Sequence, residues 1–228
     1  MNIKAEEYLK HIPEDCQINP EMLAEIYADW FYRPSTFLEI GAFDGVKWSN
    51  TWCLAALGWK GVYVEPQPEY AQLCRENHKD HDVQIVETAV GLGEGPVDLY
   101  MRDATSSIVW RDEIAKVFGL DKNEKISVPL TSADAIVEQY CPDRGPDVLV
   151  IDVEGAEIQV LQSFDLQRWR PRVVIVETCE GCIAEHYKNE QGINPIVEFC
   201  DQYFLYGPVQ YQKYHVDIEN TIFIRTIP

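Results

Sequence analysis

Basic residues are scarce in this sequence, and long apolar runs are missing. Among its 228 residues, 19 Lys and Arg stand against 38 Asp and Glu, which gives a net charge of -19. Nucleic-acid binding usually requires a basic face, so this balance argues against such a partner. No apolar run approaches the roughly 20 residues that a membrane-spanning helix needs. We therefore expect neither a nucleic acid nor a membrane as a partner.

Cysteine pairs are also lacking. The seven cysteines are scattered and odd in number, and Cys179-Glu-Gly-Cys182 has no second pair at zinc spacing. The start of the sequence has no secretory signal, so we expect reduced thiols in a cytoplasmic protein. Cys179 and Cys182 are interpreted as two thiols of a loop, with a redox or metal role as the minor alternative.

What the sequence does contain is a strand, a glycine turn and a helix start close together. The apolar run from Phe37 to Ile40 predicts a buried strand, and Gly41-Ala-Phe-Asp-Gly45 interrupts it. Gly41 lets the backbone turn sharply and approach a ligand, because it has no Cβ. This pattern predicts a ligand cradle at residues 41–45, and an ordinary corner between strand and helix is the alternative.

Acidic residues give the predicted cradle a preference for a cation. Glu39 and Asp44 would repel a pyrophosphate and attract an ammonium or a sulfonium. The spacing also lacks the third glycine of a dinucleotide site. Glu65 ends the next predicted strand, where an acid can accept both hydroxyls of a ribose. A ribose, a cationic centre and no phosphate together describe S-adenosylmethionine.

The main part of the chain alternates predicted strands and helices. This alternation predicts an α/β fold with a mostly parallel sheet, helices on both faces and an antiparallel hairpin at the end. The predicted strands are 36–41, 61–65, 83–90, 147–152, 172–177, 203–212 and 220–226, and the predicted helices are 47–58, 67–78, 132–140, 155–164 and 193–201.

Two segments stand outside this alternation. Residues 1–34 carry two predicted helices, and we interpret them as a segment that packs on or over the main domain, 35–228; a lid or a dimer contact is the alternative. An insertion over 91–128 follows the third strand, which brings it to the ligand edge of such a sheet. We expect the insertion to shape the substrate site through Ser106, Ser107 and Trp110.

Acidic residues lie at or near the carboxyl ends of all five predicted parallel strands. Ligands of open α/β sheets bind outside these ends, so the mouth of the sheet should be lined with carboxylates. We assign two of them to the cofactor and two to the substrate side, and we leave the fifth open. In that order they are Glu39 and Glu65, Asp152 and Glu177, and Glu87.

With these residues, the chain resembles FkbM-type methyltransferases over most of residues 35–226. The resemblance is carried by Phe37-Leu-Glu-Ile-Gly-Ala-Phe-Asp-Gly45, Val64-Glu-Pro66, Thr105-Ser-Ser-Ile108 and, most specifically, Val150-Ile-Asp-Val-Glu-Gly-Ala-Glu157 with the following Val160-Leu161 and Val173-Val-Ile-Val-Glu177. It implies the class I methyltransferase fold, a Rossmann-like three-layer sandwich with strand order 3-2-1-4-5-7-6. It also implies O-methylation, typically of sugar or polyketide hydroxyls.

The resemblance also implies a set of cofactor contacts. Glu39, Gly41 and Gly45 fall on the family's cofactor loop, Glu65 on its ribose acid, and Asp152 and Glu154 on its motif beside the methyl group. We expect the full set of contacts to S-adenosylmethionine to be Glu39, Gly41, Ala42, Phe43, Asp44, Gly45, Glu65, Pro66, Ala89 and Asp152. Members of the family often have Asn where this chain has Phe43 or Asp44, so the polar contacts of this loop need not follow the family's.

A hydroxyl acceptor must be held near attack distance, roughly 3 to 3.5 Å, and must lose its proton. The candidate bases are Asp152, Glu154, Glu177 and His186. Alternatively, Asp152 and Glu177 could converge on Mg²⁺ or Ca²⁺, as the resemblance to catechol-type O-methyltransferases at Asp152 suggests.

Two other functions are compatible with the sequence. A methyltransferase-like binding module would keep the fold without turnover. A nucleotide-dependent oxidoreductase also uses an acid after the second strand, but it would need the missing glycine. The acceptor molecule and the oligomeric state stay open.

Overall fold

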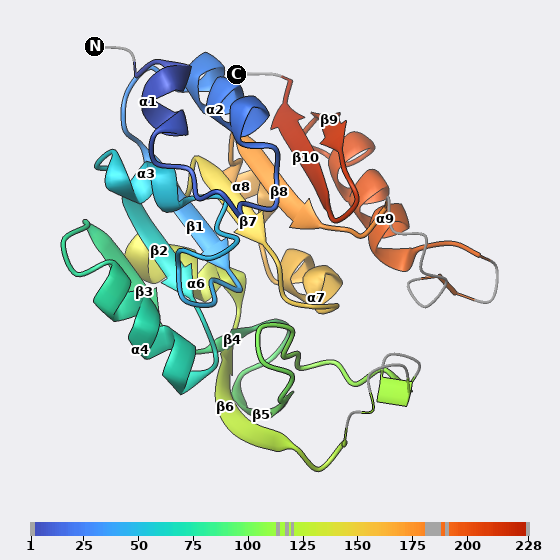
Figure 1. The fold of residues 1–228 in the computed structure, drawn as a ribbon. Coiled ribbons are helices and arrows are strands. Elements are labelled where there is room, and N and C mark those ends of the chain that lie inside the picture. Colours follow the sequence, from blue (N-terminus) through green and yellow to red (C-terminus); the bar gives the residue numbers. More distant parts are fainter. Residues whose placement is uncertain are drawn as a thin grey trace.

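Seven strands form one central sheet in the computed structural model, which describes residues 3–112, 115–116, 119, 121–180, 188–189 and 192–226 (Figure 1). The strands are β1 (Thr36–Ile40), β2 (Lys60–Val64), β3 (Val83–Val86), β7 (Val148–Ile151), β8 (Val173–Glu177), β9 (Tyr211–Val216) and β10 (Asn220–Arg225). They lie in the order β3-β2-β1-β7-β8-β10-β9.

The first five of these strands pair in parallel, and β10 runs antiparallel between β8 and β9. Numbered along the chain, this order is 3-2-1-4-5-7-6. The class I methyltransferase fold and its final antiparallel hairpin are thereby confirmed. Parallel strands end at the same edge, so the loops after β1, β2, β7 and β8 meet there.

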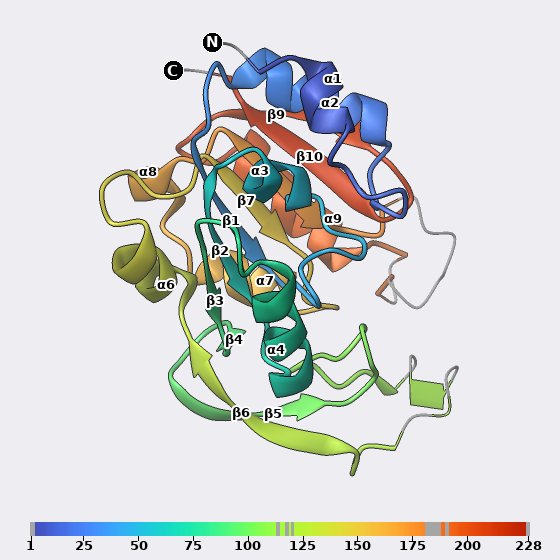
Figure 2. The ribbon, with the colours of Figure 1, turned by 60° about the vertical axis from the view of Figure 1, so that its left-hand side comes forward.

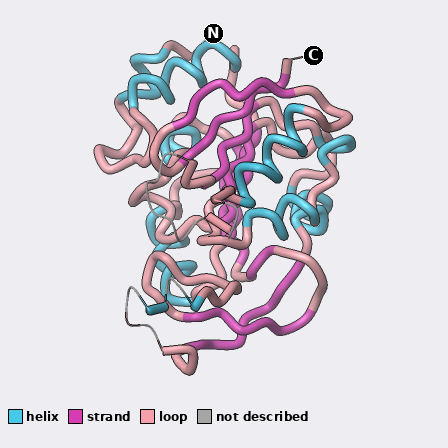
Figure 3. The backbone as a smooth tube through the Cα atoms, turned by 90° about the vertical axis from the view of Figure 1, so that its right-hand side faces the viewer, coloured by secondary structure: helices cyan, strands magenta, loops and turns pink. Residues whose placement is uncertain are grey.

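Helices cover both faces of the sheet (Figure 3). They are α1 (Ala5–Leu9), α2 (Pro20–Trp30), α3 (Trp52–Ala56), α4 (Pro68–Asn77), α6 (Ala133–Tyr140), α7 (Glu157–Gln162), α8 (Leu166–Trp169) and α9 (Pro195–Cys200). Successive strand residues point to opposite faces. On β7, Leu149 and Ile151 therefore join the core beneath α6 to α9, and Val148 and Val150 join the core beneath α1 to α3. None of the helices in the described residues could cross a membrane.

The two N-terminal helices belong to the second of these cores. Tyr8 of α1 and Tyr27 of α2 are fully buried, and their ring centroids lie 5.7 Å apart. The Tyr27 hydroxyl donates to the backbone carbonyl of Asn50 at 2.7 Å. Residues 3–33 are thus packed against the sheet and against the loop that precedes α3.

The helix predicted over 47–58 is wrong in its first turn, because α3 begins only at Trp52. A loop replaces that turn. The Asp44 carboxylate accepts a hydrogen bond from the backbone N–H of Val46 at 2.9 Å, which favours a turn over a helix. Trp48 has a φ of +61°, which a right-handed helix excludes.

The strand predicted over 83–90 splits into two strands. β3 ends at Val86, and β4 (Ala89–Val90) leaves the main sheet to pair with β6 (Lys125–Thr131). With β5 (Gly95–Tyr100), they form a three-stranded sheet of order β4-β6-β5. This small sheet lies beyond the carboxyl ends of the central strands (Figure 2).

The strand predicted over 203–212 is wrong at its start. A π-helical turn over Asp201–Leu205 continues α9, and β9 follows only at Tyr211. The turn is fixed by packing, since Phe204 is fully buried and stacks on Phe223 with ring centroids 4.4 Å apart.

Candidate active site

One pocket lies where the strand ends of the central sheet face the small sheet. Its wall comes from the loops after β1, β2, β3 and β7, from the loop after β5, and from the N-terminal segment. The lining residues are 39–43, 47–49, 64–67, 88–90, Leu99, 104–108, 152–154, Ala156 and Gln17.

Gly41 allows the loop after β1 to turn against the end of β7. Its φ is +90°, and a Cβ added there would lie 1.6 Å from the backbone oxygen of Asp152. Its N–H donates to the Val64 carbonyl at 2.9 Å, and Ala42 N–H donates to the same oxygen at 3.1 Å. A side chain at this position would overlap the backbone of Asp152, so the close contact between the two loops requires glycine.

Glu65 joins the loops after β1 and β2. Its Oε2 accepts from the backbone N–H of Phe43 at 2.9 Å, and its Oε1 accepts from that of Gln67 at 2.8 Å. The residue is 5% exposed, and burial raises the pKa of its carboxyl to about 7. Each oxygen keeps a second lone pair, so the carboxylate can still accept hydrogen bonds from a ligand.

Glu39 is also buried, but its partners come from the loop before α3. Its Oε2 accepts from the Ser49 hydroxyl at 3.0 Å and from the Thr51 hydroxyl. Burial raises the pKa of Glu39 to about 7, although these hydrogen bonds act to lower it. Glu39 therefore holds the pocket wall in place, in addition to lining it.

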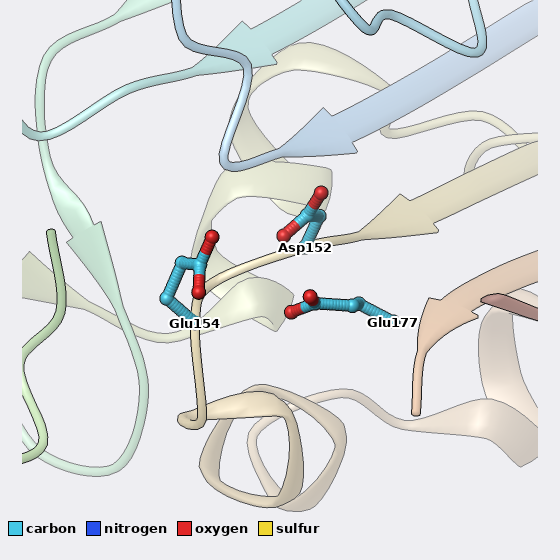
Figure 4. A group of neighbouring side chains, drawn as sticks. All are labelled: Asp152, Glu154 and Glu177. Carbon is cyan, nitrogen blue, oxygen red and sulfur yellow. The ribbon is translucent and has the colours of Figure 1, made fainter. Parts of the chain in front are cut away.

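Asp152, Glu154 and Glu177 form an acidic cluster at the ends of β7 and β8. Figure 4 shows their carboxylates pointing toward one another, and one oxygen of each lies within 4.8 Å of the others. Figure 4 thus shows the convergence of Asp152 and Glu177 expected from the strand ends.

Burial sets the charge state of this cluster. It raises the pKa of Glu177 well above its ordinary value, and repulsion from Asp152 and Glu154 acts in the same direction. Burial also raises the pKa of Asp152, but hydrogen bonds with Gln17 and Glu177 act to lower it. Both carboxyls are therefore harder to ionise than a free acid, and at Asp152 the hydrogen bonds oppose this rise in pKa.

Glu154 lies beside the pair in a strained backbone position. Its φ is +58°, a region that non-glycine residues seldom occupy. Burial raises the pKa of Glu154 well above the ordinary value, and the charges of Arg102 and Arg111 act to lower it. The next residue, Gly155, lies directly under Arg111, whose Nη2 would be 2.1 Å from an added Cβ.

Several predicted site residues do not line the pocket. Asp44 turns its carboxylate to its own loop, and Gly45 packs against Cys74 and His78 of α4 and the loop after it. Glu87 forms an exposed ion pair with Arg75 at 3.0 Å.

In the insertion, Trp110 also turns away from the pocket. It packs on Tyr100 with ring centroids 5.1 Å apart, and its indole N–H donates to Asp112 at 2.7 Å. By contrast, Ser106 and Ser107 lie in the pocket wall. His186 and Cys182 are outside the described residues.

Sequence reasoning missed Gln17 and Lys47. Gln17 Nε2 donates to Asp152 Oδ2 at 2.8 Å, across 135 positions of sequence, and no local pattern announces such a contact. Lys47 is the one basic side chain among the described residues that line the pocket, and its Nζ lies 3.9 Å from the Trp48 ring centroid. Lys47 lies two residues after Gly45, at the end of the acidic glycine turn, and this position could have indicated it from the sequence alone.

The sheet order, with a pocket at the strand ends, is that of the class I methyltransferase fold. Residues 39–204 match the methyltransferase FkbM domain, and the chain belongs to this family. It is similar to methyltransferase sdnD of Sordaria araneosa, with 35% identity over 82 residues, which are 32% of this chain and 28% of that protein.

Solved structures of methyltransferases are similar at low identity. A precorrin-6y C5,15-methyltransferase from Geobacter metallireducens is 13% identical with a TM-score of 0.43, over 94% of this chain and 92% of that chain. The C-terminal domain of precorrin-6Y C5,15-methyltransferase from Rhodobacter capsulatus is 10% identical with a TM-score of 0.43, over 99% and 98%.

Proposed function

We propose that this chain transfers the methyl group of S-adenosylmethionine to a hydroxyl of a sugar, a glycan or a polyketide-type small molecule. One observation carries the proposal. The pocket places a buried acid at the end of β2, Glu65, in the same cavity as Asp152 and Glu154 at the end of β7. A ribose acceptor and a negative wall in one cavity fit a nucleoside that carries a sulfonium.

The pocket offers a partner for each charged part of this cofactor. The free lone pairs of Glu65 would accept the ribose hydroxyls. The sulfonium would lie on the side of Asp152 and Glu154, where the charge of the wall is negative. Lys47, the single basic lining residue described, would take the carboxylate of the methionine part.

The chemistry would then be an in-line displacement. The acceptor oxygen attacks the methyl carbon, the O–CH₃ bond forms as the C–S bond breaks, and S-adenosylhomocysteine leaves. The hydroxyl proton would pass to Asp152, whose Oδ2 is held in place by Gln17. Ser106 and Ser107 line the same cavity and could orient the acceptor.

A second candidate role exists for the acidic cluster. The oxygens of Asp152, Glu154 and Glu177 are close enough to bind one cation such as Mg²⁺ or Ca²⁺, which could orient an acceptor hydroxyl. Gln17 Nε2 already donates to Asp152 Oδ2 at 2.8 Å, and a cation at that oxygen would have to displace it, so we favour the base over the cation.

Calorimetry followed by a transfer assay tests the proposal. We expect the purified protein to bind S-adenosylhomocysteine but not NAD, and to transfer a labelled methyl group to at least one compound in a panel of sugars, glycans and polyketides. Binding without transfer to any hydroxyl would favour a binding module. Absence of binding to both S-adenosylmethionine and S-adenosylhomocysteine at millimolar concentration would refute the proposal.

A further inference from the structure

The loop between α1 and α2 brings a polar side chain into the active site. Figure 1 shows this loop in dark blue, descending from α1 toward the carboxyl ends of the central strands. Gln17, on this loop, lines the pocket and donates from Nε2 to Asp152 Oδ2 at 2.8 Å. The match to the FkbM domain begins at residue 39, so this contact comes from a part of the chain outside the matched region.

The orientation of the Gln17 amide is fixed by the residues behind it. Asn50 Nδ2 donates to Gln17 Oε1 at 3.2 Å, so the other end of the Gln17 amide, its NH₂ group, faces Asp152. Asn50 is held in turn, because its Oδ1 accepts from the Cys16 thiol at 3.3 Å and its backbone oxygen accepts from Tyr27. Each hydrogen bond in this series pairs a donor with an acceptor, so Gln17 presents its N–H, and not its oxygen, to Asp152.

The residue after Gln17 and the residue that bonds its side chain are both buried. Ile18, the next residue, is fully buried, and Asn50 is 2% exposed.

Asp152 also has acidic neighbours, because Glu154 and Glu177 each bring a carboxyl oxygen within 4.8 Å of one of its own. When Glu154 and Glu177 are ionised, they repel the Asp152 carboxylate. A hydrogen-bond donor is therefore needed to hold that carboxylate in a fixed position.

We propose that Gln17 is a positioning residue that holds the Asp152 carboxylate toward the methyl donor, so that the N-terminal segment completes the active site. This inference rests on the proposed function, because it takes the sulfonium to lie on the Asp152 side of the pocket. The contact Gln17–Asp152 then favours the charged cofactor over its neutral product. S-adenosylmethionine and S-adenosylhomocysteine share every other group that the pocket can bind.

The ratio of the two affinities tests the inference without any methyl acceptor. Calorimetry would measure both ligands on the full chain and on Gln17→Met, which keeps the length of the side chain and removes the donor. We expect the affinity for S-adenosylmethionine to fall roughly tenfold, and that for S-adenosylhomocysteine less than about threefold. Gln17→Ala, which cannot overpack the loop, should change the ratio in the same direction.

Gln202→Met is the matched control, because Gln202 is exposed and does not line the pocket. Its affinity ratio should equal that of the unmodified protein. An equal fall in both affinities for Gln17→Met and Gln17→Ala, or unfolding of both variants, would overturn the positioning role and leave the proposed function intact. Failure of the unmodified protein to bind either ligand would instead refute the proposed function.

Discussion

The backbone N–H of Phe43 donates to Glu65 Oε2 at 2.9 Å, and this single bond ties the glycine turn after β1 to the acid that ends β2. The second oxygen of Glu65 is held by Gln67 N–H. The Glu65 side chain is therefore held in place by the protein itself, and under the proposed function its free lone pairs would accept the ribose hydroxyls. Fixed acceptors of this kind bind without a further cost in side-chain entropy.

Replacing Glu65 by Gln should weaken cofactor binding. The amide keeps the shape of the side chain, but it loses the charge and half of its acceptor capacity, so we expect the affinity for S-adenosylhomocysteine to fall by tenfold or more, or about 1.5 to 3 kcal/mol. Calorimetry measures this directly. Glu87→Gln is the control, because Glu87 also follows a parallel strand but pairs with Arg75 outside the pocket. Unchanged affinity in Glu65→Gln would count against the ribose assignment.

Gly41→Ala should destabilise the fold as well as the pocket. Its Cβ would overlap the backbone oxygen of Asp152, and its φ of +90° disfavours any side chain. We expect a loss of about 3 kcal/mol or more in the free energy of unfolding, measured with urea. Gly58 has a φ of +79° with nothing within 4 Å of an added Cβ, so Gly58→Ala should lose only roughly 1 to 2 kcal/mol. Equal losses in the two variants would show that the contact with Asp152 is unimportant.

The parts of the site that the sequence predicts are those that follow from strand ends. Asp152 and Glu177 directly follow or end apolar runs, and parallel strands must deliver such residues to one edge. Their convergence could be read without a structure. The same rule fails for Glu87, because β3 ends before it and the chain there turns toward β4, which belongs to another sheet.

The parts that the sequence does not predict depend on tertiary contacts or on local caps. Gln17 reaches Asp152 because α1 and α2 pack on the sheet, and nothing in its neighbours announces this distance. The apolar spacing after Trp48 resembles a helix, but the Asp44 side chain and the hydroxyl of Ser49 bond the backbone of the loop instead. Such hydrogen bonds from side chains to the backbone compete with helix formation, and the spacing of apolar residues does not predict them.

Stability should fall as pH rises through the range in which Glu39 ionises. The pKa of Glu39 is raised from 4.5 in the unfolded chain to about 7 in the fold, so the folded state binds the proton more tightly. Its contribution is present in full below pH 4.5 and is lost as pH rises through about 7. The size is roughly 3 kcal/mol.

Urea denaturation at several values between about pH 5 and about pH 8 measures this slope. Glu39→Gln should flatten it, because the amide does not titrate. The residual slope in Glu39→Gln should come from the other buried acids, since burial also raises the pKa of Glu65 to about 7 and raises those of Asp152, Glu154 and Glu177. A slope that is the same in Glu39→Gln and in the unmodified protein would show that Glu39 does not ionise across this range.

Methyl transfer should persist in EDTA. Gln17 Nε2 donates to Asp152 Oδ2 at 2.8 Å, so a hydrogen already occupies a position that a cation bound to this oxygen would need. A cation at Asp152 Oδ2 would have to turn Gln17 away. We therefore expect the rate of transfer to change less than about twofold after dialysis against EDTA. Loss of turnover that Mg²⁺ or Ca²⁺ restores would assign Asp152, Glu154 and Glu177 to a metal ion and remove Asp152 from the role of base.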